Sequence, residues 1–170
     1  MSGAGGSGAE APGQVRWLDQ EEQAAWRSIL RATHLISQEM ARALDAHTVS
    51  VGEYELLSML SEQAGERMRM AQLAELVVQS RSRVSHTATR LQKRGWVERV
   101  PSRQDGRGVV LQLTDLGREQ LAVLAPVHVE SVRRALLDHM TREELLTHGA
   151  IMRKVVLATR HSADEAADVV

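Results

Sequence analysis

Residues 80–117 read SRSRVSHTATRLQKRGWVERVPSRQDGRGVVLQLTDLG and contain the pattern that decides the fold. The first part of this stretch predicts a helix, because Ser80 or Ser82 can cap its N-terminus and Gly95 can end it after two basic residues. Apolar residues recur in this part at three- and four-residue steps, as they do on the buried side of a helix. The expected buried stripe consists of Val84, Ala88 and Leu91.

The second part of the stretch predicts a β-hairpin. Residues 96–100 (WVERV) alternate apolar and polar side chains with the period of a strand, and Pro101 ends the run. Residues 102–108 (SRQDGRG) have the composition of a loop, and residues 109–113 (VVLQL) return as the partner strand. An arginine-rich helix followed by a basic hairpin is the outline of a winged helix-turn-helix.

Further helices are expected on both sides of this stretch. Apolar side chains at helical spacing mark a long helix over residues 19–46, a second helix over residues 50–65 and a short third helix over residues 70–78. After the hairpin, the same spacing continues over residues 114–138, with Pro126 expected to kink that helix.

A last helix is predicted after Thr141, because Thr141 and Glu144 have the spacing of a capping box. The chain is therefore expected to be mainly α-helical, with about six helices and a small two-stranded β-wing. Residues 1–14 are rich in Gly, Ala and Ser and are expected to form a disordered tail, and residues 162–170 a frayed C-terminus.

Charge is distributed unevenly along the chain. Residues 81–107 contain eight basic and two acidic residues, a net charge of +6, whereas the whole chain carries −1, so the remainder carries −7. A compact basic block in an acidic protein is typical of a surface that binds a polyanion, although a solvated charged surface has the same pattern. The basic residues of the block are Arg81, Arg83, Arg90, Lys93, Arg94, Arg99, Arg103 and Arg107.

The basic helix is suited to the major groove of DNA, because its buried stripe leaves polar side chains on the opposite face. Arginine can make a two-pronged contact with guanine, and hydroxyl groups can reach phosphates or base edges. The tip of the hairpin can enter the minor groove, where Asp105 would orient Arg107. The residues predicted to contact DNA are Ser80, Arg81, Ser82, Arg83, Ser85, His86, Thr89, Arg90, Arg103, Asp105 and Arg107.

Other functional classes find little support in the sequence. The chain has no cysteine, which excludes disulfides and thiolate metal sites. No stretch approaches the roughly 20 apolar residues of a membrane span, and the N-terminus does not resemble a secretory signal, so a cytoplasmic protein is expected. None of the seven histidines pairs with another at helical spacing, and no catalytic motif occurs. We therefore expect a protein that is not an enzyme, with no catalytic residue, no cofactor and no metal site.

Short motifs in the middle of the chain occur together in one family. They are LAEL at 73–76, VS at 84–85, LQKRGWVER at 91–99, DGR at 105–107, LT at 113–114 and Gly117. Together they resemble the helix-turn-helix and wing of the MarR (multiple antibiotic resistance) regulators, over about residues 48–120. The flanking helices resemble the family's dimerisation helices only in length and order. One departure is Gly106, where relatives often have a second basic residue.

The resemblance implies a bacterial transcriptional regulator, most simply a repressor, that binds a palindromic operator in double-stranded DNA as a homodimer. Residues 15–48 and 115–161 would form the dimerisation helices, and residues 49–114 the DNA-binding lobe. A small aromatic or anionic effector is also implied. The residues on segments that can line its pocket are Trp26, Arg31, His34 and Tyr54.

By position in the motifs, Ser82, Arg83 and His86 would lie at base edges and Arg107 in the minor groove. Two alternatives stay open. One is a metal-responsive regulator of the same fold, with zinc held by histidines from separate elements. The other is a winged helix that serves protein–protein contact or packages DNA without sequence preference.

Overall fold

The computed structural model describes residues 15–102 and 109–167, and it divides into two compact units, residues 1–34 and 35–170. The described part of the first unit consists of a short extended segment and most of helix α1 (Gln20–Asp45). This helix starts where the sequence predicted, because Asp19 and Glu22 cap it reciprocally. The Glu22 amide donates to the Asp19 carboxylate (2.8 Å), and the Asp19 amide donates to the Glu22 carboxylate (3.1 Å).

The second unit holds the end of α1 and the other helices. They are α2 (Val51–Ser61), α3 (Met70–Leu76), α4 (Arg81–Lys93), α5 (Asp115–Ala135) and α6 (Arg142–Ala167), with short 3₁₀ helices η1 (Ala64–Glu66) and η2 (Leu137–His139). The prediction of about six helices is confirmed. Helix α5 is continuous through Pro126, and α6 ends at Ala167, while the expected fraying of residues 162–170 stays a prediction.

The caps explain why these helices begin where they do. The Ser50 hydroxyl accepts the Glu53 amide at the start of α2, and the Thr114 hydroxyl accepts the Gly117 amide at the start of α5. Thr141 and Glu144 form the predicted capping box ahead of α6.

The sheet has three antiparallel strands in the order β1-β3-β2, not two as the sequence predicted. The predicted hairpin is present as β2 (Val97–Pro101) and β3 (Val109–Leu113), with Val97 opposite Leu113. The additional strand β1 (Arg67–Arg69) pairs with the other edge of β3. It is only three residues long, too short for an alternating pattern to mark it, and it is a strand because β3 offers an unpaired edge.

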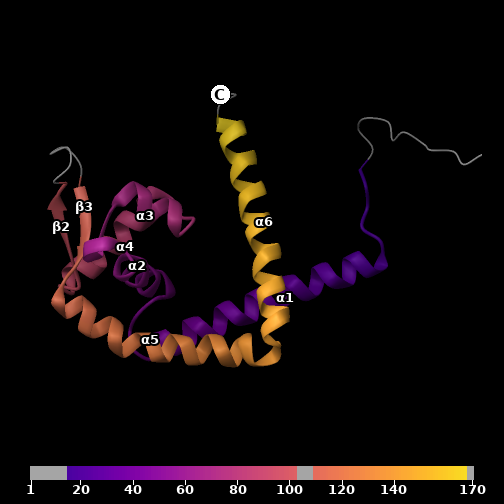
Figure 1. Ribbon diagram of the computed structural model, residues 1–170, viewed down its shortest axis with the longest axis horizontal. Coiled ribbons are helices and arrows are strands. Elements are labelled where there is room, and N and C mark those ends of the chain that lie inside the picture. Colours follow the sequence, from indigo (N-terminus) through magenta and orange to yellow (C-terminus); the bar gives the residue numbers. More distant parts are fainter. Residues whose placement is uncertain (1–14, 103–108, 168–170) are drawn as a thin grey trace, which may run out of the picture. The chain divides into compact units, whose positions relative to one another are not determined.

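The core of the second unit is aliphatic, as a chain without phenylalanine requires. Helices α2, α3 and α4 lie together beside the sheet (Figure 1), and their leucines and valines meet between them. This packing fixes α4 against α2 on one side and β2 on the other. The fully buried side chains include Leu44, Leu56, Leu57, Leu60, Leu73, Val84, Leu91, Leu111 and Leu113.

A tight junction joins the end of α4, the start of β2 and the start of α5. The Thr114 hydroxyl donates to the Gly95 carbonyl (2.7 Å), and the Thr114 amide donates to the Trp96 carbonyl (3.1 Å). Gly95 has a φ of +73°, which favours glycine. Gly117 has no space for a side chain, because a Cβ atom there would lie 2.0 Å from the Trp96 carbonyl oxygen. These contacts give a physical reason for the Leu-Thr-x-x-Gly motif.

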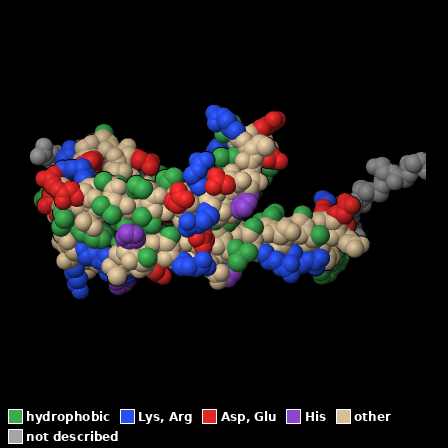
Figure 2. All heavy atoms as spheres, turned by 90° about the horizontal axis from the view of Figure 1, so that it is seen from below, with side chains coloured by type: hydrophobic (Ala, Val, Ile, Leu, Met, Phe, Trp, Pro, Cys, Tyr) green, Lys and Arg blue, Asp and Glu red, His purple; other side chains and the backbone are tan. Residues whose placement is uncertain are grey.

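Hydrophobic side chains also lie at the surface of the long helices. Figure 2 shows them beside basic side chains along α1. On α1, Trp26 is 50% exposed and Leu30 49%, and on α6, Ile151 is 48% exposed and Val155 53%. No helix in the described ranges is long and apolar enough to cross a bilayer.

Candidate nucleic-acid interface

Helix α4 is the centre of the predicted interface, and its ends are well defined. Ser80 caps it, with its hydroxyl accepting the Arg83 amide (3.3 Å), and Arg94 closes it before Gly95. The predicted stripe of Val84, Ala88 and Leu91 is fully buried, and Thr87 joins it at 4% exposure.

The opposite side of α4 is exposed and polar. With 3.6 residues per turn, the middle of this side is formed by residues separated by three or four positions. They are Ser82, His86, Thr89 and Lys93, all of them exposed. The structure therefore presents a polar helix face about three turns long, as the sequence predicted.

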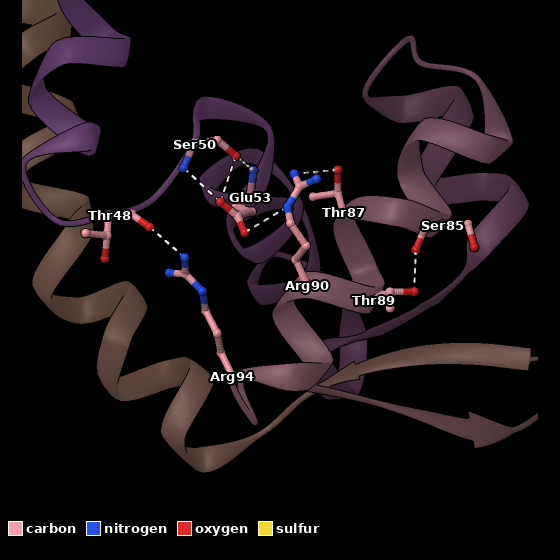
Figure 3. Close-up of polar contacts among 8 residues, drawn as sticks. All are labelled: Thr48, Ser50, Glu53, Ser85, Thr87, Thr89, Arg90 and Arg94. Atoms are coloured by element: carbon pink, nitrogen blue, oxygen red, sulfur yellow. Dashed lines mark hydrogen bonds and ion pairs between the residues drawn. The ribbon is translucent and has the colours of Figure 1, made fainter.

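One flank of this face is tied to α2 (Figure 3). Arg90 extends from α4 toward Glu53 on α2, with its Nε 3.3 Å from the carboxylate, and also donates to the Thr87 hydroxyl (3.4 Å). Glu53 is only 3% exposed and accepts further hydrogen bonds from the Ser50 amide (2.9 Å) and hydroxyl (2.8 Å). Arg90 was predicted to contact DNA. Its contact with DNA stays a prediction, and the guanidinium already has a protein partner in Glu53.

The ionised form of Glu53 is favoured by its surroundings. Burial alone raises the pKa of the Glu53 carboxyl, but the hydrogen bonds from Ser50 and Arg90 and the nearby charge of Arg94 outweigh it. The pKa of Glu53 therefore lies below its ordinary value of 4.5. Arg94 itself donates to the Thr48 carbonyl (2.7 Å) and lies over the Trp96 ring, 4.9 Å from its centre.

The other flank is tied to the sheet by Arg99 of β2. Its guanidinium donates to the Gln92 side chain, to the Thr89 hydroxyl (3.0 Å) and to the Ser85 carbonyl (3.2 Å). The sequence placed Arg99 in the basic block and Gln92 in a family motif, but it did not reveal these contacts, and no pattern pointed to Glu53.

The basic block thus divides into two groups within the described residues. Arg90, Arg94 and Arg99 are used in internal contacts, whereas Arg81 and Lys93 have no hydrogen bond or ion pair to any described residue. Arg83 is exposed, and its charge acts on the carboxyl of Glu55. The predicted wing residues Arg103, Asp105 and Arg107 lie outside the described residues.

The residues predicted to line an effector pocket lie in both units. Trp26, Arg31 and His34 are exposed on α1 in the first unit, and Tyr54 is buried in the second, where its ring packs 4.2 Å from that of His128. Tyr54 is therefore a core residue of its unit, and the effector site stays a prediction. Within the described ranges, no three histidine or carboxylate side chains gather closely enough to hold a metal ion.

Comparisons with known proteins agree with this geometry. A family model described as MarR family matches residues 47–108. Two solved structures from Streptomyces coelicolor are similar. AbsC, a MarR family transcriptional regulator, is 36% identical with a TM-score of 0.82, over 86% of this chain and 99% of AbsC. Sco3205, a MarR family transcriptional regulator in complex with DNA, is 41% identical with a TM-score of 0.80, over 85% of this chain and 91% of Sco3205.

A curated relative, the HTH-type transcriptional regulator PecS of Dickeya dadantii, is 26% identical over 139 residues, which cover 81% of this chain and 83% of PecS. The similarity to AbsC and Sco3205 extends over both the middle of the chain and its long helices.

Proposed function

Since the chain belongs to the MarR family and is a DNA-binding transcriptional regulator, we propose that it binds a palindromic operator as a homodimer and represses transcription there. The relatives reported above are regulators, not enzymes. Repression would follow from the operator being occupied in competition with polymerase. The protein would act in the cytoplasm, where the bacterial chromosome lies.

The observation that supports this proposal most directly is the exposed polar face of α4. Ser82 and His86 lie one turn apart in its middle, and Arg83 lies beside them, so three side chains suited to base edges share one helix surface. Arg81 and Lys93, at opposite ends of the helix, can neutralise phosphates. The caps hold this helix in a fixed register, which base recognition requires.

The homodimer is argued from the long terminal helices. A single exposed leucine is common on a protein surface and needs no explanation. Exposed apolar side chains recur along both α1 and α6, however, which favours a partner that covers them. A second copy of the chain is the partner we propose for them. The variant Ile151→Arg should then dissociate the dimer, which light scattering after gel filtration would detect. A monomeric wild type, or an unchanged dimer in the variant, would contradict this part of the proposal.

DNA binding is tested by fluorescence anisotropy with duplexes from the region upstream of the protein's own gene and with shuffled duplexes of equal composition. We expect a preference of at least about 1,000-fold for one upstream duplex. Equal affinity for all duplexes would instead indicate a packaging protein, and no binding a protein-interaction module.

Two substitutions separate the roles of individual side chains. Arg81→Gln should weaken binding to every duplex and lower the slope of log affinity against log salt by about one. Arg142→Gln, which removes one exposed charge from α6, is the matched control and should leave the slope unchanged. His86→Ala should change base preference at one position of each half-site, at a cost of about 1–3 kcal/mol.

We also propose a small aromatic or anionic effector, with Trp26, Arg31 and His34 of α1 as its first candidates, since Tyr54 packs in the core of the second unit. Titration of the protein–operator complex with aromatic carboxylates would release the DNA if this is right. Zinc responsiveness is the second candidate mechanism, and the same assay with zinc and then a chelator distinguishes it.

A further inference from the structure

Arg99 on β2 makes an unusual set of contacts with α4. One guanidinium group donates to three positions of the helix, namely the Gln92 side-chain oxygen, the Thr89 hydroxyl and the Ser85 carbonyl. These positions are separated by four and three residues, so they lie in one row along the helix surface. The row runs along the sheet side of the exposed face of α4 and shares Thr89 with the middle of that face.

The contacts fix the hydrogen-bonding capacity of the row. The Thr89 hydroxyl donates its single proton to the Ser85 carbonyl (2.9 Å) and accepts from Arg99 (3.0 Å), so it has no proton left for a phosphate. Arginine can only donate, so the Gln92 atom that meets Arg99 must be the amide oxygen. The amide nitrogen of Gln92 then points away from Arg99. Its two N–H groups are available as donors, because the Gln92 side chain is exposed.

Arg99 also connects two elements that must act together on a duplex. It lies opposite Leu111 in the β2–β3 pairing, inside the sheet that carries the wing, while its side chain holds α4. On the other flank, the Arg90–Glu53 pair ties α4 to α2. The helix is thus braced on both sides of its exposed face, and on the sheet side Arg99 supplies the brace.

We propose that Arg99 is a positioning residue for operator recognition, which fixes the sheet against α4 and presents the Gln92 amide as a donor to acceptor atoms on base edges. The inference rests on the proposed function, because it concerns how the same α4 face reads DNA. The proposal predicts that Arg99 contributes to sequence preference and that its guanidinium does not contact a phosphate.

The test compares Arg99→Lys and Arg99→Gln with Arg81→Gln in the anisotropy assay. Both Arg99 variants should lose about tenfold in the ratio of operator to shuffled-duplex affinity, since one ordered base-reading side chain contributes about 5- to 150-fold. The salt slope should change by less than half a unit in Arg99→Gln. Arg81→Gln, the matched control, should show the reverse pattern: a slope lowered by about one and an unchanged ratio.

Coupling to Gln92 is a second readout. Gln92→Ala should lower the operator ratio in the wild-type background and have little effect when Arg99 is already replaced, because the amide is then no longer held. Equal effects of Gln92→Ala in the two backgrounds would overturn the proposal, as would a uniform loss of affinity with a lowered slope in Arg99→Gln.

A third measurement separates this inference from the proposed function. The effects of Arg99→Lys and Thr89→Val on thermal stability without DNA should be non-additive, because the two side chains are hydrogen-bonded to each other. Additive effects would show that the hydrogen bond between Arg99 and Thr89 does not form, and they would overturn the inference. If the wild type itself shows no operator preference, the proposed function fails and the role of Arg99 in recognition fails with it, whatever the stability cycle gives.

Discussion

Replacement of Glu53 tests how α4 is held against α2. Glu53→Gln keeps the volume of the buried side chain and an oxygen that can accept the Ser50 amide, but removes the negative charge that faces Arg90. Glu53→Ala removes the carboxylate together with the Cγ methylene group. The two variants therefore separate the contribution of the charge from that of capping and packing.

The magnitudes follow from burial. The Arg90 side chain is 54% exposed, so its ion pair is screened and should contribute less than about 1 kcal/mol. The hydrogen bonds from Ser50 are stronger to a carboxylate than to an amide, and we expect about 1 kcal/mol in total for Glu53→Gln. Loss of the capping box and of one buried methylene should bring Glu53→Ala to about 3 kcal/mol.

The assay is urea unfolding followed by circular dichroism at one fixed protein concentration, since association would otherwise shift the midpoint. The pKa of Glu53 is lowered in the folded protein, so its charge stabilises the fold above about pH 4.5 and loses that effect as the pH falls through the folded pKa. The difference between wild type and Glu53→Gln should therefore shrink below pH 4.5.

Glu62→Gln, an exposed carboxylate at the end of the same helix, is the control and should change stability by less than about 0.5 kcal/mol. Equal stability of wild type and Glu53→Gln at pH 7 would refute the assigned role of the charge. So would a difference between them that persists undiminished at pH 3.

Three further predictions can be checked in the same unfolding assay. Gly117→Ala should lower the free energy of unfolding by at least about 2 kcal/mol, because the new Cβ would lie 2.0 Å from a backbone carbonyl oxygen. Gly149→Ala in α6 is the control: its Cβ would lie 3.8 Å from the Arg153 side chain, and the protein should become more stable by up to about 1 kcal/mol. Val78→Asn should stabilise by about 1 kcal/mol, since Val78 has a φ of +51°, and a loss of stability would contradict the strain assigned there. Burial lowers the pKa of His128 below 6.5, so the stability of the wild type should decline as the pH falls below 6.5. His128→Phe should abolish this decline, whereas His47→Phe, at an exposed position, should retain it.

The sequence predicted those parts of the fold that depend on local chemistry. The caps at Ser80 and Thr141, the buried stripe of α4 and the β2–β3 hairpin are all encoded within a few consecutive residues. The strand β1 was missed because its pairing depends on β3, more than 40 residues away in the chain.

The candidate site could be predicted only in outline. Periodicity identified the exposed side of α4, but it treated Arg90 and Thr89 as equally available for DNA. Their partners Glu53 and Arg99 lie 37 and 10 residues away, and such pairings follow from tertiary packing. The packing of the Tyr54 ring against His128, which belongs to a different helix, is a further contact that periodicity did not reveal.

The junction at Thr114 and Gly117 has a mechanical consequence. Because the Gly117 backbone touches the Trp96 carbonyl and the Thr114 hydroxyl bonds the Gly95 carbonyl, no slack loop separates the first turn of α5 from the C-terminal end of α4. The first turn of α5 and the C-terminal end of α4 are therefore expected to move together. A movement of the first turn of α5 would either shift the exposed face of α4 or break these contacts.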